Sequence, residues 1–513
     1  MPAITVSNET QTQSQPQTHA FQYTSTESST PTSIPLARTL STSYHPERVH
    51  LNHKWDHGYN LSMEQFLRYM PKVELHVHLD GSMDPLFLWD YLKKKRSSSS
   101  VSGSSGNCSN VMECLPEEVT LPWNNQTLKV RSAVEACTTL EEFTTLITCR
   151  GERSLFAMLE CFEIFVPIVR GNLVLLEQLA FDFCQRQFSQ RVMYTEVRYS
   201  PHFLVKLAEK ECEDEGKDGS GDGSDDSDND INSNSNSDDR GTMKKHKGTG
   251  TGARDVIDAI TRGLRRGEKE YGIKVNQILC CIAWRPDWAR EVVELARDYK
   301  DNYPCAVVGV DIAAGEDHFD QEKLPHLYEP HYEAFQIAQE YDLNITIHAG
   351  EVGDSQFVRK AVNEYGARRI GHGYKIACEP DVMEEMRRKN IHFEVCPTSS
   401  NETGGWAYDG DGRDNSDNSG ECGGKEWKKH PAIDMIRYGL NVGINSDDPA
   451  VFDTSLTWQY RIGVGKMGMS KDAIITCLQN SISSAFVEED VKVWMRNRVD
   501  IFLEEHDECM NET

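Results

Sequence analysis

The sequence predicts an α/β fold, a TIM (β/α)8 barrel in which eight parallel strands alternate with helices. Three observations support this prediction. Eight short runs rich in β-branched and apolar residues recur along the chain, and most stretches between them carry apolar residues at helical spacing. Histidine and carboxylate side chains gather near the ends of these runs. Active sites of such barrels lie at the C-terminal ends of the strands, so one site is expected there.

The eight predicted strands are bounded by polar or turn-forming residues. In chain order they are Val73–Leu79, Val192–Ser200, Val275–Ala283, Ala306–Ala313, Asn344–His348, Arg368–Tyr374, Ile391–Cys396 and Asn441–Asn445. Helical spacing of apolar residues is clearest over Val292–Tyr299, Tyr332–Tyr341 and Asp381–Lys389. Strands that alternate with helices in this way form parallel sheets, and eight such units close a barrel.

The barrel is expected to span residues 60–505 and to be interrupted by three polar insertions. These insertions, at about 97–110, 209–252 and 408–424, are rich in Ser, Gly, Asn or Asp and are expected to be flexible loops. Residues 1–45 form a Ser/Thr/Gln-rich segment that is expected to be a disordered tail. An organelle transit segment is the alternative for this tail, but the tail contains a single Arg.

The composition excludes several classes of protein. The formal charge is −27, and residues 209–240 alone hold 13 Asp/Glu against 3 Lys/Arg. Nucleic acids and anionic membranes bind basic surfaces, so neither is an expected partner. The chain has 15 Cys, several of them in apolar runs, which favours reduced core thiols over a disulfide framework. With no apolar run near the roughly 20 residues that span a bilayer and no secretory leader, a cytoplasmic monomer is expected.

Four short motifs near predicted strand ends carry the side chains that a metal-dependent hydrolytic site needs. They are His76-Val77-His78, His348-Ala349-Gly350-Glu351, Gly371-His372-Gly373 and Ser446-Asp447-Asp448-Pro449. His76 and His78 share one face of a strand, because side chains i and i+2 point the same way. Each motif alone is commonly structural, for example a solvent-facing His pair or a surface loop. Their coincidence at strand ends favours one shared site instead.

Together these motifs supply the donor set of a hydrolytic zinc centre. Three imidazoles and one carboxylate leave a position for water on a zinc ion, which lowers the pKa of that water to about 7. Glu351 lies too far along the chain from His348 to be assumed a ligand, and it suits a general acid or base. Adjacent buried carboxylates such as Asp447 and Asp448 need a cation or hydrogen-bond donors. One metal ion is expected, because binuclear sites in related barrels use a bridging lysine on the fourth strand, and Val307–Gly315 contains no Lys.

Six longer motifs resemble those of the adenosine deaminases, within the amidohydrolase superfamily. They are Pro71–Gly81, Glu196–His202, Ile347–Gly353, Gly371–Tyr374, His392–Pro397 and Asn445–Pro449. The resemblance runs from about Met70 to Phe502 and is interrupted only by the polar insertions. It implies hydrolysis of adenosine and 2′-deoxyadenosine to inosine and 2′-deoxyinosine with release of ammonia, a reaction of purine salvage.

The resemblance also implies which residues hold the metal and carry out catalysis. One zinc ion would be held by His76, His78, His348 and Asp447. Glu351 would protonate N1 of the purine and make C6 electrophilic. His372 would orient the zinc hydroxide, and Asp447 would accept its proton as well as bind the metal.

Four substrate contacts follow from the same resemblance. Asp448 would bind N7, Asp80 would bind a ribose hydroxyl, and His78 would border the substrate as well as the metal. A glycine backbone amide after the fourth strand would meet N3. The spacing of the family places this amide at Ala314, and Gly315 comes one residue later. We predict Gly315, because a one-residue bulge is easier to accommodate than loss of the glycine.

Rival interpretations stay open. An adenine deaminase on the same barrel would not need Asp80 as a ribose partner. A nucleotide deaminase would need basic residues at the mouth for phosphate, and the acidic insertions disfavour that. Secreted growth-factor-like adenosine deaminases would carry a leader and an extra N-terminal region, and cytidine-type deaminases carry a Pro-Cys-x-x-Cys motif that is absent here. A non-catalytic binding protein should lack a ligand or the acid, and neither is missing.

Overall fold

The computed structural model describes residues 61–98, 115–151, 153–205, 251–406 and 426–511. The tail predicted over residues 1–45 lies outside these ranges. Almost all residues of the three predicted insertions, at 97–110, 209–252 and 408–424, lie outside them as well. The predicted barrel is therefore tested by the segments between the insertions.

Eight parallel strands form one sheet in the order β1-β4-β5-β6-β7-β8-β9-β10. They are β1 (Lys72–His78), β4 (Val192–Tyr199), β5 (Lys274–Ile282), β6 (Val307–Ala313), β7 (Asn344–Ala349), β8 (Arg369–His372), β9 (His392–Val395) and β10 (Asn441–Ile444). The sheet closes where the chain after β10 meets β1, because His78 N donates to Asp447 O at 2.8 Å and Asp447 N donates to His76 O at 3.1 Å. The TIM barrel predicted from the sequence is confirmed, and each predicted strand overlaps one of these eight.

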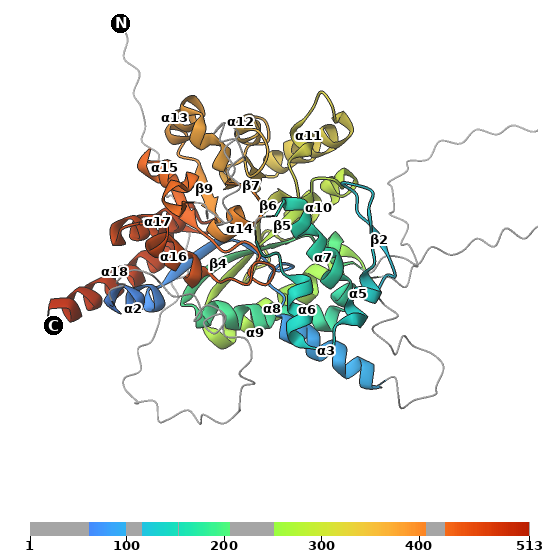
Figure 1. Ribbon diagram of the computed structural model, residues 1–513. Coiled ribbons are helices and arrows are strands. Elements are labelled where there is room, and N and C mark those ends of the chain that lie inside the picture. Colours follow the sequence, from blue (N-terminus) through green and yellow to red (C-terminus); the bar gives the residue numbers. More distant parts are fainter. Residues whose placement is uncertain (1–60, 99–114, 152, 206–250, 407–425, 512–513) are drawn as a thin grey trace, which may run out of the picture. The chain divides into compact units, whose positions relative to one another are not determined.

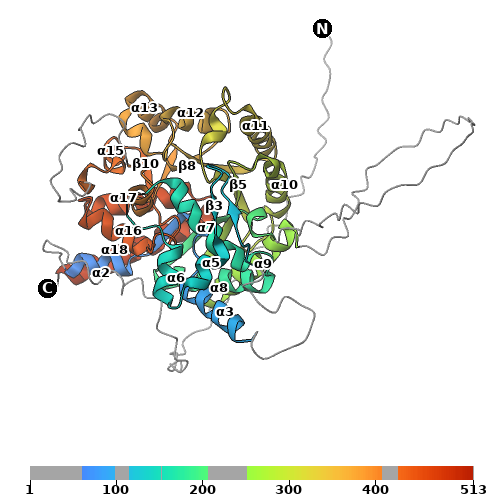
Figure 2. The same ribbon diagram turned by 45° about the vertical axis from the view of Figure 1, so that its right-hand side comes forward.

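Helices surround the strands, as the two views show (Figure 1, Figure 2). They are α2 (Leu61–Tyr69), α3 (Pro85–Ser98), α5 (Val130–Ala136), α6 (Leu140–Ile147), α7 (Leu155–Val169), α8 (Leu173–Ser189), α9 (Ala253–Tyr271), α10 (Ala289–Tyr299), α11 (Pro325–Glu340), α12 (Ser355–Asn363), α13 (Pro380–Arg388), α14 (Pro397–Glu402), α15 (Pro431–Arg437), α16 (Leu456–Gly465), α17 (Lys471–Ser484) and α18 (Glu489–Asn511). The three predicted helical stretches correspond to α10, α11 and α13. The sequence does not predict the antiparallel pair of β2 (Val119–Thr120) and β3 (Thr127–Leu128), because two-residue strands carry no periodic pattern.

Strand β1 shows how the sequence sorts its side chains. All seven residues of β1 are buried, as expected for a parallel strand that is covered on both faces. Val73 and Leu75 pack outward into a cluster with Leu478 of α17. His76 points the other way, and its Nδ1 lies 2.9 Å from Glu394 Oε2 of β9. The period of two along the strand therefore separates core-forming apolar residues from polar residues inside the barrel.

The cysteine side chains agree with the expectation of reduced thiols in a core. Among the cysteines that the structure describes, ten are free thiols, and nine of these are buried. Burial disfavours the thiolate and raises the pKa of Cys161 and Cys184 to about 12. Within the described ranges, no helix combines the length and the apolarity that crossing a membrane requires.

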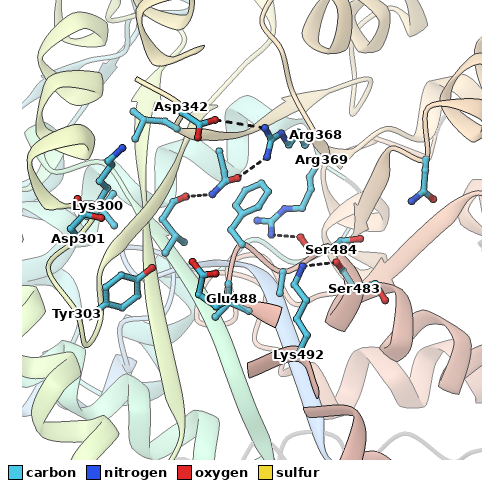
Figure 3. A pocket seen from close by; sticks show the side chains of 18 residues that line it. Lys300, Asp301, Tyr303, Asp342, Arg368, Arg369, Ser483, Ser484, Glu488 and Lys492 are labelled. Carbon is cyan, nitrogen blue, oxygen red and sulfur yellow. Dashed lines mark hydrogen bonds and ion pairs between the residues drawn. The ribbon is translucent and has the colours of Figure 1, made fainter. Parts of the chain in front are cut away.

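A cavity of about 500 Å3 opens at the N-terminal ends of β6, β7 and β8, away from the strand ends that carry the histidines (Figure 3). Both arginines that line it have carboxylate partners. Arg368 lies 4.0 Å from Asp342, and buried Arg369 lies 2.6 Å from Glu196 and stacks on the Phe486 ring. The N-terminal face of a TIM barrel usually contributes to stability, and this internal pairing fits that role.

Candidate active site and metal centre

The predicted site residues converge at the C-terminal end of the barrel. They end or closely follow β1, β7, β8 and β10, and are His76, His78, His348, His372 and Asp447. All five side chains are buried. The closed sheet brings together strand ends that are far apart in sequence, so the predicted ligands and the predicted catalytic histidine share one place.

Donor atoms of the four predicted zinc ligands lie close to one another. Asp447 Oδ1 is 3.1 Å from His76 Nε2 and 3.5 Å from His78 Nε2. His78 Nε2 is 3.4 Å from His348 Nε2. Ligand atoms at about 2.0–2.1 Å from a tetrahedral zinc ion stand roughly 3.3 Å apart, so these separations fit one metal ion. His372 joins His76, His348 and Asp447 in a group whose ligand atoms all lie within 4.8 Å of one another.

A buried network of charges fixes two of the imidazole rings. His76 Nδ1 lies 2.9 Å from Glu394 Oε2, and His348 Nδ1 lies 3.1 Å from Asp311 Oδ1. Arg198 bridges the two carboxylates, donating to Glu394 at 2.7 Å and to Asp311 at 2.8 Å. Burial opposes ionisation of Glu394, but the Arg198 and Arg369 guanidinium groups and the His76 hydrogen bond together outweigh burial and hold the pKa of that carboxyl well below its usual range. The sequence motifs assign no role to Arg198, Asp311 or Glu394.

These contacts determine which ring nitrogens face the proposed metal position. A carboxylate accepts from Nδ1–H, so the Nε2 atoms of His76 and His348 carry lone pairs. Among the described residues His76 Nε2 has no hydrogen-bond partner, although Asp447 Oδ1 lies only 3.1 Å away. Lone pairs and a carboxylate this close repel one another unless a cation lies between them. The donor set therefore fits a metal ion, and neutral imidazole with carboxylate is a set that zinc binds well.

Glu351 lies beside this group. Its Oε1 accepts a hydrogen bond from Thr403 Oγ1 at 3.2 Å, and its Oε2 is 3.6 Å from His372 Nε2. Burial, reinforced by the charge of Asp447, raises the pKa of Glu351 to about 8. The carboxyl therefore keeps its proton at neutral pH, as a general acid must.

Asp80 and Asp448 present buried carboxyl groups to the same cavity. Asp80 Oδ2 accepts from Ser200 N at 3.3 Å, whereas Asp80 Oδ1 and Asp448 Oδ1 have no hydrogen-bond partner within the described ranges. Burial raises the pKa of Asp80 to about 7. A Cβ on Gly81 would lie 1.8 Å from Asp448 Oδ1, so only glycine permits this approach. Unsatisfied buried polar atoms in a cavity indicate where polar groups of a ligand bind.

Apolar side chains form the outer wall of the cavity. Helix α7 contributes one face to it, namely Leu155, Met158, Leu159 and Phe162. Trp123 and Trp284 add aromatic surface, and the described lining contains five carboxylates but no Lys or Arg. The cavity has a volume of about 70 Å3, which is smaller than the roughly 300–1,000 Å3 of typical ligand pockets. A ligand that fills a typical pocket would therefore enter only if the apolar wall moved.

Three residues of the site hold a positive φ without being glycine. They are Ala314 at +67°, His372 at +67° and Asp447 at +66°. Such conformations cost about 1–3 kcal/mol each and cluster at functional sites. Ala314 lines the cavity, whereas Gly315, the predicted purine contact, is not among its described lining residues. Gly315 holds φ +129°, so both candidates for the purine contact have a positive φ, and of the two Ala314 is the one that lines the cavity.

Sequence comparisons match this chain to one family over most of its length. The family described as "Adenosine deaminase" matches residues 131–412 and 422–502. The chain is 30% identical over 422 residues to the adenosine deaminase of Xenopus tropicalis, a match that covers 82% of this chain and 92% of that protein. It is 26% identical over 439 residues to the adenosine deaminase of Enterococcus faecalis, covering 85% of this chain and 98% of that protein.

Solved structures share the fold at lower sequence identity. The adenine deaminase of Arthrobacter aurescens matches with a TM-score of 0.58 at 17% identity, over 85% of this chain and 99% of that chain. The N6-methyl-AMP deaminase of Arabidopsis thaliana matches with a TM-score of 0.56 at 19% identity, over 85% of this chain and 98% of that chain. These two proteins are named for different purine substrates, adenine and N6-methyl-AMP, so the shared barrel does not determine the substrate.

Proposed function

Because the chain belongs to the adenosine deaminase family, we propose that it catalyses the zinc-dependent hydrolytic deamination of adenosine and 2′-deoxyadenosine. The products are inosine and 2′-deoxyinosine with ammonia, which places the enzyme in purine nucleoside salvage. The observation that carries this proposal is the convergence of the four predicted ligands beside Glu351, whose pKa of about 8 keeps it protonated.

The residues proposed to hold one zinc ion per chain are His76, His78, His348 and Asp447. When bound there, zinc lowers the pKa of a water molecule to about 7 and so supplies a nucleophile at neutral pH. The protein orients the ligands through Glu394 and Asp311, which fix two imidazole rings. His372, with its Nε2 3.8 Å from Asp447 Oδ2, is proposed to orient the attacking water.

Proton donors and acceptors in the cavity are proposed to hold the purine ring and the ribose. Protonated Glu351 donates to N1, which makes C6 electrophilic. Burial, with the charge of Asp447, raises the pKa of Asp448 well above its usual range, so Asp448 keeps a proton to donate to N7. Asp80 accepts from a ribose hydroxyl, and the backbone amide of Ala314 donates to N3.

The charges of the cavity favour a nucleoside over the two rival substrates. Five carboxylates line it, Glu163 among them, and the described lining contains neither Lys nor Arg to neutralise a phosphate. The phosphate of AMP would therefore lose its hydration on entering without gaining a cationic partner. Adenine has no ribose, so it would leave the buried Asp80 Oδ1 without a donor.

Substrate turnover is the direct test of this proposal. The near-ultraviolet absorbance should fall as the enzyme converts adenosine to inosine. For AMP and adenine, kcat/KM should be at least about 10²-fold lower than for adenosine, because a buried charge without a partner costs several kcal/mol. 2′-Deoxyadenosine serves as the matched control and should react, since it keeps other ribose hydroxyls. Faster reaction with AMP or adenine would overturn the cavity assignment, and silence of the zinc-loaded protein toward all four would overturn the function.

Metal removal tests the proposed cofactor. Dialysis against a zinc chelator should abolish turnover, and stoichiometric zinc should restore it, because the nucleophile depends on the ion. The measurement is metal content by elemental analysis alongside activity, and chelator presaturated with zinc is the control. Full activity in metal-free protein would contradict the proposal.

Other expectations about this chain stay predictions. They are a cytoplasmic location, a monomeric state and no binding of nucleic acid. The charge of −27 supports the last of these, because nucleic acids bind basic surfaces.

A further inference from the structure

Glu316 binds the loop that carries Glu351 through four backbone amides. Gly350 N donates to Glu316 Oε2 at 2.6 Å. The amides of Glu351, Val352 and Gly353 donate to Glu316 Oε1 at 3.0, 2.9 and 3.0 Å. Glu316 is only 5% exposed, so converging amides stabilise its charge in place of bulk water. Hydrogen bonds to an ionised acceptor are roughly twice as strong as neutral ones.

The position of Glu316 connects two loops of the site. It comes two residues after Ala314, in the loop that follows β6, and its four donors lie in the loop that follows β7. A Cβ on Gly353 would lie 2.8 Å from Glu316 Oε2, so glycine there allows the carboxylate to sit this close. One carboxylate therefore ties the backbone beside the cavity at Ala314 to the backbone that presents Glu351.

We infer that Glu316 is a positioning residue, which acts on the reaction by fixing where Glu351 stands relative to the substrate. The inference rests on the proposed function, in which Glu351 donates a proton to the purine. Glutamine cannot replace this carboxylate, because both carboxylate oxygens accept hydrogen bonds from backbone N–H groups. The NH2 group of glutamine would place a donor against one of these N–H donors. Displacing a reacting group by about 1 Å can cost roughly 10² in rate, so loss of this anchor should reach catalysis.

Glu316→Gln is the first variant that tests this role. We expect kcat for adenosine to fall by about tenfold to a hundredfold, with KM and zinc content changed by less than about threefold, since proton donation to N1 matters mainly in the transition state. Glu316→Asp keeps the charge and should recover part of the loss. The matched control is Glu322→Gln, an exposed glutamate that follows in the same loop and should leave kcat unchanged.

A double variant separates positioning from a general structural role. In a Glu351→Gln background, Glu316→Gln should change kcat by less than about threefold, because Glu316 acts through Glu351 and the effects of coupled residues are not additive. An equal loss in both backgrounds, or a rise in KM with kcat intact, would overturn the inference. If Glu316→Gln does not fold, the same comparison is made with Glu316→Asp.

Hydrogen exchange tests whether Glu316 anchors the loop, and this measurement does not depend on catalysis. The amides of residues 350–353 should exchange at least about tenfold faster in Glu316→Gln than in the parent protein, because a lost hydrogen bond opens them to solvent. Unchanged exchange there would overturn the anchoring itself. If the parent protein does not turn over adenosine, the proposed function is overturned, but hydrogen exchange still tests whether Glu316 anchors the loop. If the parent and Glu316→Gln are equally active, only the positioning role is overturned.

Discussion

Replacing Glu351 with Gln is expected to lower kcat for adenosine by about 10²–10⁴, the usual contribution of a positioned general acid. Gln has nearly the same shape and still donates a hydrogen bond, but it cannot transfer a proton to N1 of the purine. Burial raises the pKa of Glu351 to about 8, so the group that is lost is a protonated acid at neutral pH. Steady-state kinetics with adenosine measure the effect.

Metal content distinguishes loss of the acid from loss of the metal centre. Glu351 is not one of the proposed ligands, so zinc per chain should stay at the parent level in Glu351→Gln. The exposed Glu340 on α11 offers a matched control, and Glu340→Gln should leave kcat unchanged. A zinc-depleted Glu351→Gln protein, or one within tenfold of the parent kcat, would show that Glu351 is a ligand or a bystander.

The fold and the proposed metal position could be predicted because they depend on local patterns. Parallel strands that are buried on both faces carry continuous apolar runs in the sequence, and Ile278–Ile282 of β5 is one of these. His76 and His78 are placed on one face by the period of the strand alone. Closure of the barrel then brings His348 and Asp447 to the same end, because the C-terminal ends of parallel strands share one face.

The supporting contacts could not be predicted, because they exist only between strands that are distant in sequence. Arg198 pairs with Asp311 across 113 positions and with Glu394 across 196. Nothing in the residues around Arg198 indicates which carboxylates it reaches. Residue type favours Gly315 over Ala314 as the purine contact, whereas Ala314 is the one that lines the cavity, and both hold a positive φ. The strain there is visible only in the backbone.

Arg198→Met is expected to destabilise the folded protein by about 3–5 kcal/mol, because it leaves buried Asp311 without its guanidinium partner and Glu394 with Arg369 alone. Arg198 is fully buried, and its guanidinium lies 2.8 Å from Asp311 and 2.7 Å from Glu394. Met fills much of the same volume, so the loss reports charge more than packing. Denaturant unfolding of parent and variant measures the difference in free energy.

The same variant should bind zinc about 10–100-fold more weakly, as changes to residues that orient metal ligands usually do. Asp311 and Glu394 orient His348 and His76, and without Arg198 these carboxylates gain protons more easily and bond the rings less well. Arg290→Met removes an exposed arginine from α10 and should change stability by less than about 0.5 kcal/mol. If Arg198→Met matched Arg290→Met in both unfolding and zinc titration, the buried network would contribute neither stability nor ligand orientation. A loss of stability with parent-level zinc affinity would mean that Arg198 stabilises the fold but does not orient the proposed ligands. A loss of both would mean that the same buried network stabilises the barrel and orients those ligands.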